Sequence, residues 1–128
     1  MNYLLDTHLL LWAAGKPERL SATARDLIRN PANTLLFSAA SLWEVAIKRS
    51  LGRGDFQVDP RRLWRMLLAH GYSDLPIGSE HSVAVGALPP LHKDPFDRML
   101  VAQAKTEMIT LLTADARIAD YGEPVRLV

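Results

Sequence analysis

Acidic side chains stand close to the ends of the apolar runs in this sequence. Asp6 follows "NYLL", and Asp115 follows "ITLLT" after a single alanine. Glu44 lies on the segment after "TLLF", and Asp97 opens the segment that leads into "ITLLT". If these runs form neighbouring strands, the carboxylates converge, and two of them about 4 Å apart repel by about 4 kcal/mol at an effective dielectric constant of about 20. A bound divalent cation would relieve this repulsion, so the pattern predicts a metal site.

The available ligand types narrow the choice of metal. The chain has no cysteine, which excludes thiolate ligands, and hard carboxylate oxygens favour Mg²⁺ or Mn²⁺ over Zn²⁺. His8 and His92 are potential ligands, but a single histidine beside an apolar run is more often a structural hydrogen-bonding residue. We therefore assign the predicted metal site to carboxylates alone.

Each carboxylate also has a purely local explanation. Asp6 and Asp115 could cap the helices that follow them, and Ser41 with Glu44 has the spacing of a capping box. Glu44 could also pair with Lys48, one helical turn away. A cap needs only one oxygen acceptor, however, and serine, threonine or asparagine would serve equally well. An acid at every junction is therefore better explained by a shared site.

The segment "LHKDPFDRML", residues 91–100, places two carboxylates three residues apart. Asp94 precedes Pro95, which is typical of an N-cap followed by proline at the first helical position. Asp97 then occupies the position from which a capping-box acid reaches back to the N-cap amide. Taken alone, this segment favours helix capping over catalysis for both acids.

Short strands that alternate with helices must position these acids. Continuous apolar runs separated by helical patterns predict an α/β fold with a parallel sheet covered on both faces. In such sheets ligands bind beyond the carboxyl ends of the strands, where the acids are expected. The expected strands are Tyr3–Leu5, Thr34–Phe37 and Thr110–Thr113, with weaker signals at Leu75–Ile77 and Val125–Leu127. The expected helices are Thr7–Ala14, Ala22–Arg29, Leu42–Leu51, Pro60–Ala69, Glu80–Leu88, Pro95–Lys105 and Ala116–Ala119.

The composition is that of a single globular domain, residues 1–128. Hydrophobic residues make up 48% of the chain and charged residues 23%, which excludes a disordered chain. Asp6 and His8 interrupt the first apolar run and no basic residue precedes it, so we expect neither a signal peptide nor a membrane helix. The lack of cysteine fits the reducing cytoplasm. A net charge of +1 neither requires nor excludes a nucleic-acid partner.

Four motifs occur in series between residue 1 and about residue 121. They are "DTHLLLW", "SAASLWEVAIK", "LPPLHKDPFDRMLVAQA" and "LLTADARIADY". In this order and at these spacings they resemble the PIN-domain ribonucleases, and specifically the toxin halves of VapBC-type toxin–antitoxin pairs. The stretch from Arg53 to about Tyr72 carries no recognised motif. The resemblance implies a three-layer α/β/α sandwich around a central, mainly parallel sheet of four to five strands.

The resemblance also implies roles for individual residues. Thr113 matches the hydroxyl residue of the family's T-x-D turn, and Asp94 would mainly cap its helix while supporting the site. The implied activity is that of a Mg²⁺- or Mn²⁺-dependent endoribonuclease, in which a metal-activated water hydrolyses an RNA phosphodiester and leaves a 5′-phosphate and a 3′-hydroxyl. The residues implied to bind the metal and to catalyse are Asp6, Glu44, Asp97 and Asp115.

Basic and apolar residues indicate where partners would bind. Lys93 and Arg98 flank the acidic pair, and Lys48 follows Glu44, so we take these basic residues as candidate contacts to RNA. The run Leu9–Trp12 covers most of a helix circumference, which fits either a central helix buried on all sides or a face that binds a partner. The resemblance implies two such partners, a second copy of the chain in a homodimer and a VapB-type antitoxin.

Two other functions are compatible with this pattern. A small-molecule phosphatase could use Asp6 as its nucleophile, but such enzymes usually carry a second acid two residues later, where this chain has His8. A non-catalytic RNA- or protein-binding module could keep the fold, but it would not need the complete acidic set. Both are weaker hypotheses than the nuclease.

Overall fold

Five parallel strands form the centre of the molecule, whose computed structural model describes residues 1–128. The strand order is β3-β2-β1-β4-β5, and every neighbouring pair is parallel. The predicted α/β fold is confirmed, and the sheet is wholly rather than mainly parallel. The strands are β1 (Asn2–Leu5), β2 (Thr34–Ser38), β3 (Ser73–Leu75), β4 (Thr110–Thr113) and β5 (Val125–Leu127).

Helical segments connect the successive strands, because parallel strands can be joined only by a crossover. The region from Arg53 to Tyr72, which carries no recognised motif, forms a short 3₁₀ helix and then α4. The α-helices are α1 (Thr7–Gly15), α2 (Ala22–Arg29), α3 (Ala39–Ser50), α4 (Pro60–Ala69), α5 (Ser79–Val85), α6 (Pro95–Glu107) and α7 (Ala116–Ala119). The 3₁₀ helices, which sequence patterns did not predict, are η1 (Pro17–Arg19) and η2 (Gly54–Phe56).

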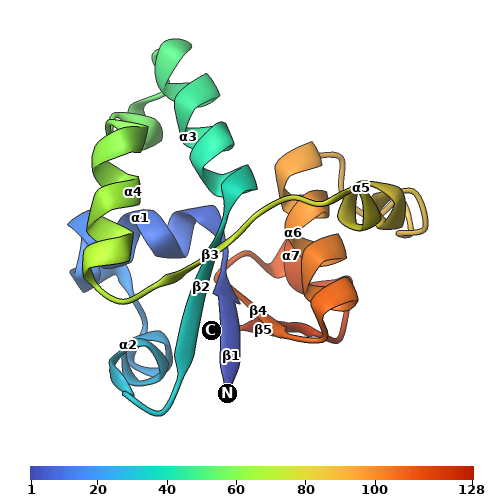
Figure 1. Ribbon diagram of the computed structural model, residues 1–128, viewed down its shortest axis with the longest axis horizontal. Helices are drawn as coiled ribbons and strands as arrows, with labels where there is room; N and C mark the ends of the chain where they lie inside the picture. The colour runs from blue at the N-terminus through green and yellow to red at the C-terminus, as the bar shows by residue number, and fades with distance from the viewer.

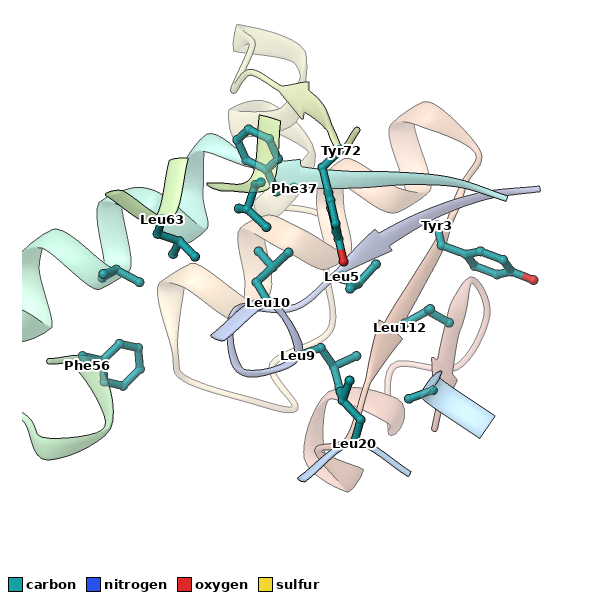
Figure 2. Close-up of a cluster of buried hydrophobic side chains, with 13 residues drawn as sticks. Tyr3, Leu5, Leu9, Leu10, Leu20, Phe37, Phe56, Leu63, Tyr72 and Leu112 are labelled. Carbon is teal, nitrogen blue, oxygen red and sulfur yellow. The ribbon is translucent and has the colours of Figure 1, made fainter. Parts of the chain in front are cut away.

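Alternate residues of the central strand β1 face opposite sides of the sheet, as the pleat requires. Tyr3 and Leu5 belong to one buried cluster, which Figure 2 shows together with residues of α1 and α4. Leu4 belongs to a second cluster, which contains residues of α6 and α7. Helices α1, α2 and α4 lie on one side of the sheet and α5, α6 and α7 on the other (Figure 1). The predicted three-layer sandwich is therefore confirmed.

The capping box predicted at Ser41 is not formed. Strand β2 runs directly into α3, and the N-cap is Ser38, whose hydroxyl accepts a hydrogen bond from the Ala40 amide at 3.0 Å. Ser41 lies inside the helix, where its hydroxyl oxygen is 2.9 Å from the Thr7 hydroxyl oxygen. Because the last residue of the strand already supplies the cap, the helix that carries Glu44 begins earlier than its sequence pattern suggested.

Two other boundaries also differ from the expected ones. Strand β3 covers Ser73–Leu75 instead of Leu75–Ile77, because its register pairs Ser38 with Leu75 and the next residue, Pro76, has no amide hydrogen to continue the ladder. Helix α5 ends at Val85, whereas the expected helix extended to Leu88. These boundaries depend on pairing and packing, which short sequence patterns do not record.

The apolar run of α1 is not buried on all sides, in contrast to one of the two predicted interpretations. Leu9 and Leu10 are completely buried in the first cluster, whereas Leu11 and Trp12 are only half-buried at its edge. One side of the helix therefore belongs to the core, and the other side remains accessible. No helix in this structure combines the length and the apolar character that crossing a membrane requires.

Candidate active site

The carboxyl ends of β1 and β4 bring together residues from opposite ends of the chain. The two strands are neighbours, with Leu5 opposite Leu112, so Asp6 and Thr113 lie side by side. The Thr113 hydroxyl donates a hydrogen bond to Asp6 Oδ2 at 2.5 Å. Helices α3, α6 and α7 begin at this end of the sheet and contribute further carboxylates. We term the resulting cluster the acidic edge: Asp6, Glu44, Asp94, Asp97 and Asp115.

Asp6 is both a helix cap and a member of the acidic edge. It is 3% exposed, and its Oδ1 accepts a hydrogen bond from the Leu9 amide at 2.9 Å. Burial raises the pKa of Asp6 to about 6, the charges of Asp115 and Glu44 contribute to this rise, and the hydrogen bonds from Thr113 and Leu9 oppose it. A cation placed here would favour the ionised form of Asp6.

Glu44 is buried, and both of its carboxylate oxygens are bonded within the protein. Oε1 accepts a hydrogen bond from the Thr7 hydroxyl at 2.6 Å, and Oε2 accepts one from the Lys48 ammonium at 2.5 Å. The predicted pair between Glu44 and Lys48 is confirmed. Lys48 Nζ also lies 3.7 Å from Asp94 Oδ2. Lys48 therefore offsets part of the negative charge of the acidic edge.

Asp94 caps helix α6, as its place before Pro95 predicted. Its Oδ1 accepts hydrogen bonds from the amides of Phe96 at 2.8 Å and Asp97 at 3.0 Å. Asp97 does not reach back to the Asp94 amide, so the reciprocal half of the predicted capping box is absent. The side chain of Asp97 is free to serve another purpose.

His92 holds the carboxylate of Asp97 from the preceding loop. Its Nε2 lies 2.8 Å from Asp97 Oδ2, and both side chains are largely buried. Burial raises the pKa of Asp97 to about 6, the charges of Asp94, Glu44 and Asp6 contribute to this rise, and the hydrogen bond with His92 opposes it. Sequence patterns did not reveal this contact, because the loop that carries His92 has no periodicity that could indicate a partner.

Asp115 is the most exposed of the candidate metal-binding acids. Its Oδ1 accepts a hydrogen bond from the Arg117 amide at 2.9 Å, and its Oδ2 lies 2.9 Å from Arg117 Nη2. The Arg117 guanidinium lowers the pKa of Asp115. Sequence reasoning did not single out Arg117, although its position two residues after Asp115 in "TADAR" was a possible signal. Arg117 is cationic and is bonded to Asp115, so it offsets part of the negative charge of the acidic edge.

The donor chemistry of the acidic edge fits a hard divalent cation. The side chains offer carboxylate oxygens without any thiol, and the pKa values of Asp6 and Asp97 are raised by burial and by neighbouring carboxylates. In this conformation, no three acidic or histidine side chains close around a single point, and Lys48 and Arg117 bond to two of the acids. Binding an ion would therefore require side-chain rotation at the acidic edge.

Arg98, a predicted RNA contact, hydrogen-bonds to the α5–α6 loop, residues 86–94. Its guanidinium donates hydrogen bonds to the carbonyl oxygens of Pro89 at 3.0 Å and Val85 at 3.2 Å, and to the Tyr121 hydroxyl at 2.9 Å. The guanidinium orders the loop through these bonds. In this conformation the same guanidinium is not available to a substrate. Lys93, in contrast, is exposed.

His8 lines a groove between α1 and α4. Its Nε2 is 4.0 Å from Asp55 Oδ2, and the groove has a volume of about 700 Å³. We term this hollow the α1–α4 groove; it contains none of the five acids. Apolar and basic side chains of the groove include Leu11, Trp12, Arg49, Arg62, Leu63 and Met66.

Comparison with known sequences identifies the family of this chain. A model of the PIN domain matches residues 3–124. Ribonuclease VapC22 from Mycobacterium tuberculosis strain ATCC 25618 / H37Rv is 30% identical over 122 residues, which cover 94% of this chain and 92% of that protein. The match to the PIN-domain model includes the motifs that carry Asp6, Glu44, Asp97 and Asp115.

Solved structures share the same fold at lower sequence identity. A chain in the crystal structure of VapBC2 from Rickettsia felis bound to a promoter DNA fragment has a TM-score of 0.70 and 19% identity, over 100% of this chain and 98% of that one. A chain in the structure of VapBC-1 from nontypeable Haemophilus influenzae has a TM-score of 0.68 and 17% identity, over 100% of this chain and 97% of that one. The fold, the acidic edge and these matches lead to one conclusion: the chain belongs to the PIN domain family.

Proposed function

We propose that this chain is a metal-dependent endoribonuclease of the cytoplasm and the toxin of a VapBC-type toxin–antitoxin pair. The observation that carries the proposal is the acidic edge, where Asp6 and Asp97 both have a pKa raised to about 6 and lie among further carboxylates. Membership of the PIN family and the identity to ribonuclease VapC22 support RNA as the substrate. The position of His8 in the α1–α4 groove gives no support to the alternative phosphatase.

The chain's own residues hold and orient the reacting groups. Mg²⁺ or Mn²⁺, when bound, activates a water molecule and neutralises charge that develops on the phosphate. Thr113 holds Asp6 through its hydroxyl, and Asp94 organises the start of α6 and thereby the position of Asp97. The residues proposed to hold the ion, directly or through water, are Asp6, Glu44, Asp97 and Asp115.

Two lysines are proposed to contact the RNA backbone. Lys93 is exposed and directly precedes Asp94, so it lies close to any phosphate bound at the acidic edge. Lys48 is bonded to Glu44 and would turn to the backbone when a bound ion takes over the neutralisation of the acids. Both contacts would be weakened by salt, because they act through charge. Arg98 has no part in this proposal.

A VapB-type antitoxin is the proposed protein partner, and a homodimer is the proposed form of the chain. The α1–α4 groove combines apolar residues such as Leu11 and Trp12 with more basic than acidic side chains, namely Lys16, Arg19, Arg49 and Arg62 against Asp55 and Asp59. An amphipathic, acidic segment of an antitoxin would match this surface. The named solved relatives are VapBC proteins, which supports the assignment. Copurification with the product of the adjacent reading frame would test the antitoxin, and sedimentation of the purified chain would test the dimer.

Cleavage of RNA by the purified chain tests the enzymatic proposal. We expect cleavage with Mg²⁺ or Mn²⁺, products with a 5′-phosphate, and no cleavage in EDTA. Asp97→Asn should abolish the activity because it removes a proposed ligand. Asp74→Asn makes the same chemical change at an exposed position on β3 and should cleave like the wild type. Undiminished cleavage in EDTA, or by Asp97→Asn purified identically, would contradict the proposal.

A further inference from the structure

An aromatic pair joins the two helices that carry Glu44 and Asp97. Trp43 directly precedes Glu44 on α3, and Phe96 directly precedes Asp97 on α6. The two rings are arranged edge to face, with centroids 5.1 Å apart and planes inclined at 79°. Phe96 is half-buried, whereas Trp43 is 57% exposed. The large flat ring of Trp43 is therefore exposed to solvent and packs against the ring of Phe96.

The pair lies beside the charge network of the acidic edge. Lys48 Nζ is 5.8 Å from the centroid of the Phe96 ring, and the same ammonium is bonded to Glu44 and lies 3.7 Å from Asp94. A phosphate group over the acids would therefore place its flanking nucleotides close to Trp43 and Phe96.

Except for the exposed Lys93, the basic side chains around the acidic edge are already engaged. Lys48 is bonded to Glu44, Arg117 to Asp115, and Arg98 to carbonyl groups of its loop. The net charge of the chain is only +1, so the electrostatic attraction that usually dominates nucleic-acid binding is weak here. A contact that does not depend on charge would add to the few available cations in holding a polyanion against a cluster of carboxylates.

We propose that Trp43 is a stacking platform for an unpaired base of the RNA substrate, beside the phosphodiester bound at the acidic edge, with Phe96 as its positioning residue. Aromatic side chains bind single strands in this way because every base has a flat π-face. The bases of a duplex are stacked on one another, so only single-stranded or looped RNA offers such a face. The inference rests on the proposed nuclease function and adds a residue that would hold the base beside the cleaved phosphodiester.

Steady-state cleavage of a short single-stranded RNA tests the platform. We expect Trp43→Ala to lower kcat/KM by about 5- to 140-fold, mainly through KM, which corresponds to about 1–3 kcal/mol for the loss of one stacked base. Trp43→Phe retains a flat ring and should recover most of the loss. Trp64→Ala removes another partly exposed tryptophan, on α4, and should have no effect. Equal losses in Trp43→Ala and Trp43→Phe, or no loss in either, would overturn the proposal.

Fluorescence of Trp43 provides a readout that does not require cleavage. The variant Trp12→Phe/Trp64→Phe retains Trp43 as its sole tryptophan, because the chain has three. In stopped-flow mixing with Mg²⁺ present, single-stranded RNA should quench this fluorescence before it is cleaved, while a duplex of the same sequence or an abasic ribose-phosphate strand should not. Equal quenching by the abasic strand would overturn the proposal, because it would show that the backbone and not a base is bound.

The two measurements separate failure of the platform from failure of the nuclease proposal. Cleavage without base-dependent quenching would refute the platform alone, and quenching without any cleavage by the wild type would refute the nuclease alone. Sedimentation of Trp43→Ala tests whether a second copy of the chain, and not RNA, covers the aromatic pair. If this variant cleaves RNA like the wild type but dissociates a homodimer, the aromatic pair is an interface between two copies and the platform is wrong.

Discussion

Individual acids of this chain cap helices and also belong to the acidic edge. Asp6 caps α1 with one carboxylate oxygen, and its other oxygen accepts a hydrogen bond from the Thr113 hydroxyl. Asp115 caps α7 and pairs with Arg117. Serine or asparagine would cap either helix, so capping explains why an oxygen acceptor stands at each position but not why it is charged. The acidic edge explains the charge.

The raised pKa of Asp6 predicts a pH-dependent stability of the metal-free protein. This pKa is raised from 3.8 to about 6, so between about pH 4 and about pH 6 the folded state binds more protons than the unfolded state. The free energy of unfolding should therefore decrease as the pH rises through this window, by about 3 kcal/mol for a shift of about two units. Urea unfolding in EDTA should show a smaller decrease for Asp6→Asn than for the wild type, because Asp97, whose pKa is also raised to about 6, still titrates in the variant.

The free energies of unfolding of Asp6→Asn and the wild type must be compared at each pH, because other carboxyls titrate as well. Asp115 has a lowered pKa, and its contribution to stability is lost as the pH falls, which is the opposite direction. Asp74→Asn, at an exposed position of β3, should retain the wild-type pH dependence. Identical pH dependences for Asp6→Asn and the wild type would show that Asp6 titrates normally in the fold.

Among the larger elements, the loop between α5 and α6, residues 86–94, is tied to the helix that follows it. Arg98 of α6 donates hydrogen bonds to carbonyl groups on or next to this loop. His92 on the loop bonds in turn to Asp97 of α6. The helix thus orders the loop that orients its own acid.

This arrangement predicts that Arg98 affects activity without contacting RNA. Arg98→Ala should lower the cleavage rate by roughly 10- to 100-fold, since a displacement of about 1 Å in a site can have an effect of this size. Arg98→Lys should not restore the rate, because an ammonium cannot reproduce the fork of a guanidinium. Hydrogen exchange should become faster in residues 86–94 of both variants and stay unchanged in α1.

The exposed Arg65 on α4 provides the matched control, and Arg65→Ala should leave both the rate and the exchange unchanged. A loss of activity in Arg98→Ala without any change in the loop's exchange would contradict the positioning role. It would instead restore Arg98 as a direct contact to the RNA.

At the scale of the whole molecule, the acidic edge should destabilise the metal-free fold and a bound ion should relieve this. An ion at about 100 times its dissociation constant would stabilise the native state by about 2.7 kcal/mol if the unfolded chain binds none, which shifts the melting temperature by several degrees. Asp97→Asn removes one repelling charge, so its metal-free form should melt higher and respond less to Mn²⁺. Melting curves with and without Mn²⁺ measure both effects.

Asp94→Asn is the control for this series, since asparagine caps a helix about as well as aspartate. It should keep most of the wild-type response to Mn²⁺. If the wild type, Asp94→Asn and Asp97→Asn all melt alike and ignore the ion, the acids do not form a shared metal site. Separate helix caps would then be the better explanation of their positions.

Local patterns in the sequence were sufficient for the parts of this protein that depend on near neighbours. Apolar runs located the central strands β1, β2 and β4, because each strand is buried on both faces. Asp94 before Pro95 identified the cap of α6, which depends only on the adjacent amides. The acids at the strand ends were identified in the same way, since parallel strands carry their carboxyl ends to one edge.

The tertiary structure alone decided which groups meet at that edge. The bonds of Thr113 with Asp6, Thr7 with Glu44 and Arg98 with Tyr121 join residues distant in the sequence, and the cap at Ser38 depends on how β2 passes into α3. Sequence periodicity records whether a side chain is buried, because burial follows from the position on a helix or strand. It does not record the partner of a polar side chain, because that choice depends on the packing of elements from the whole chain.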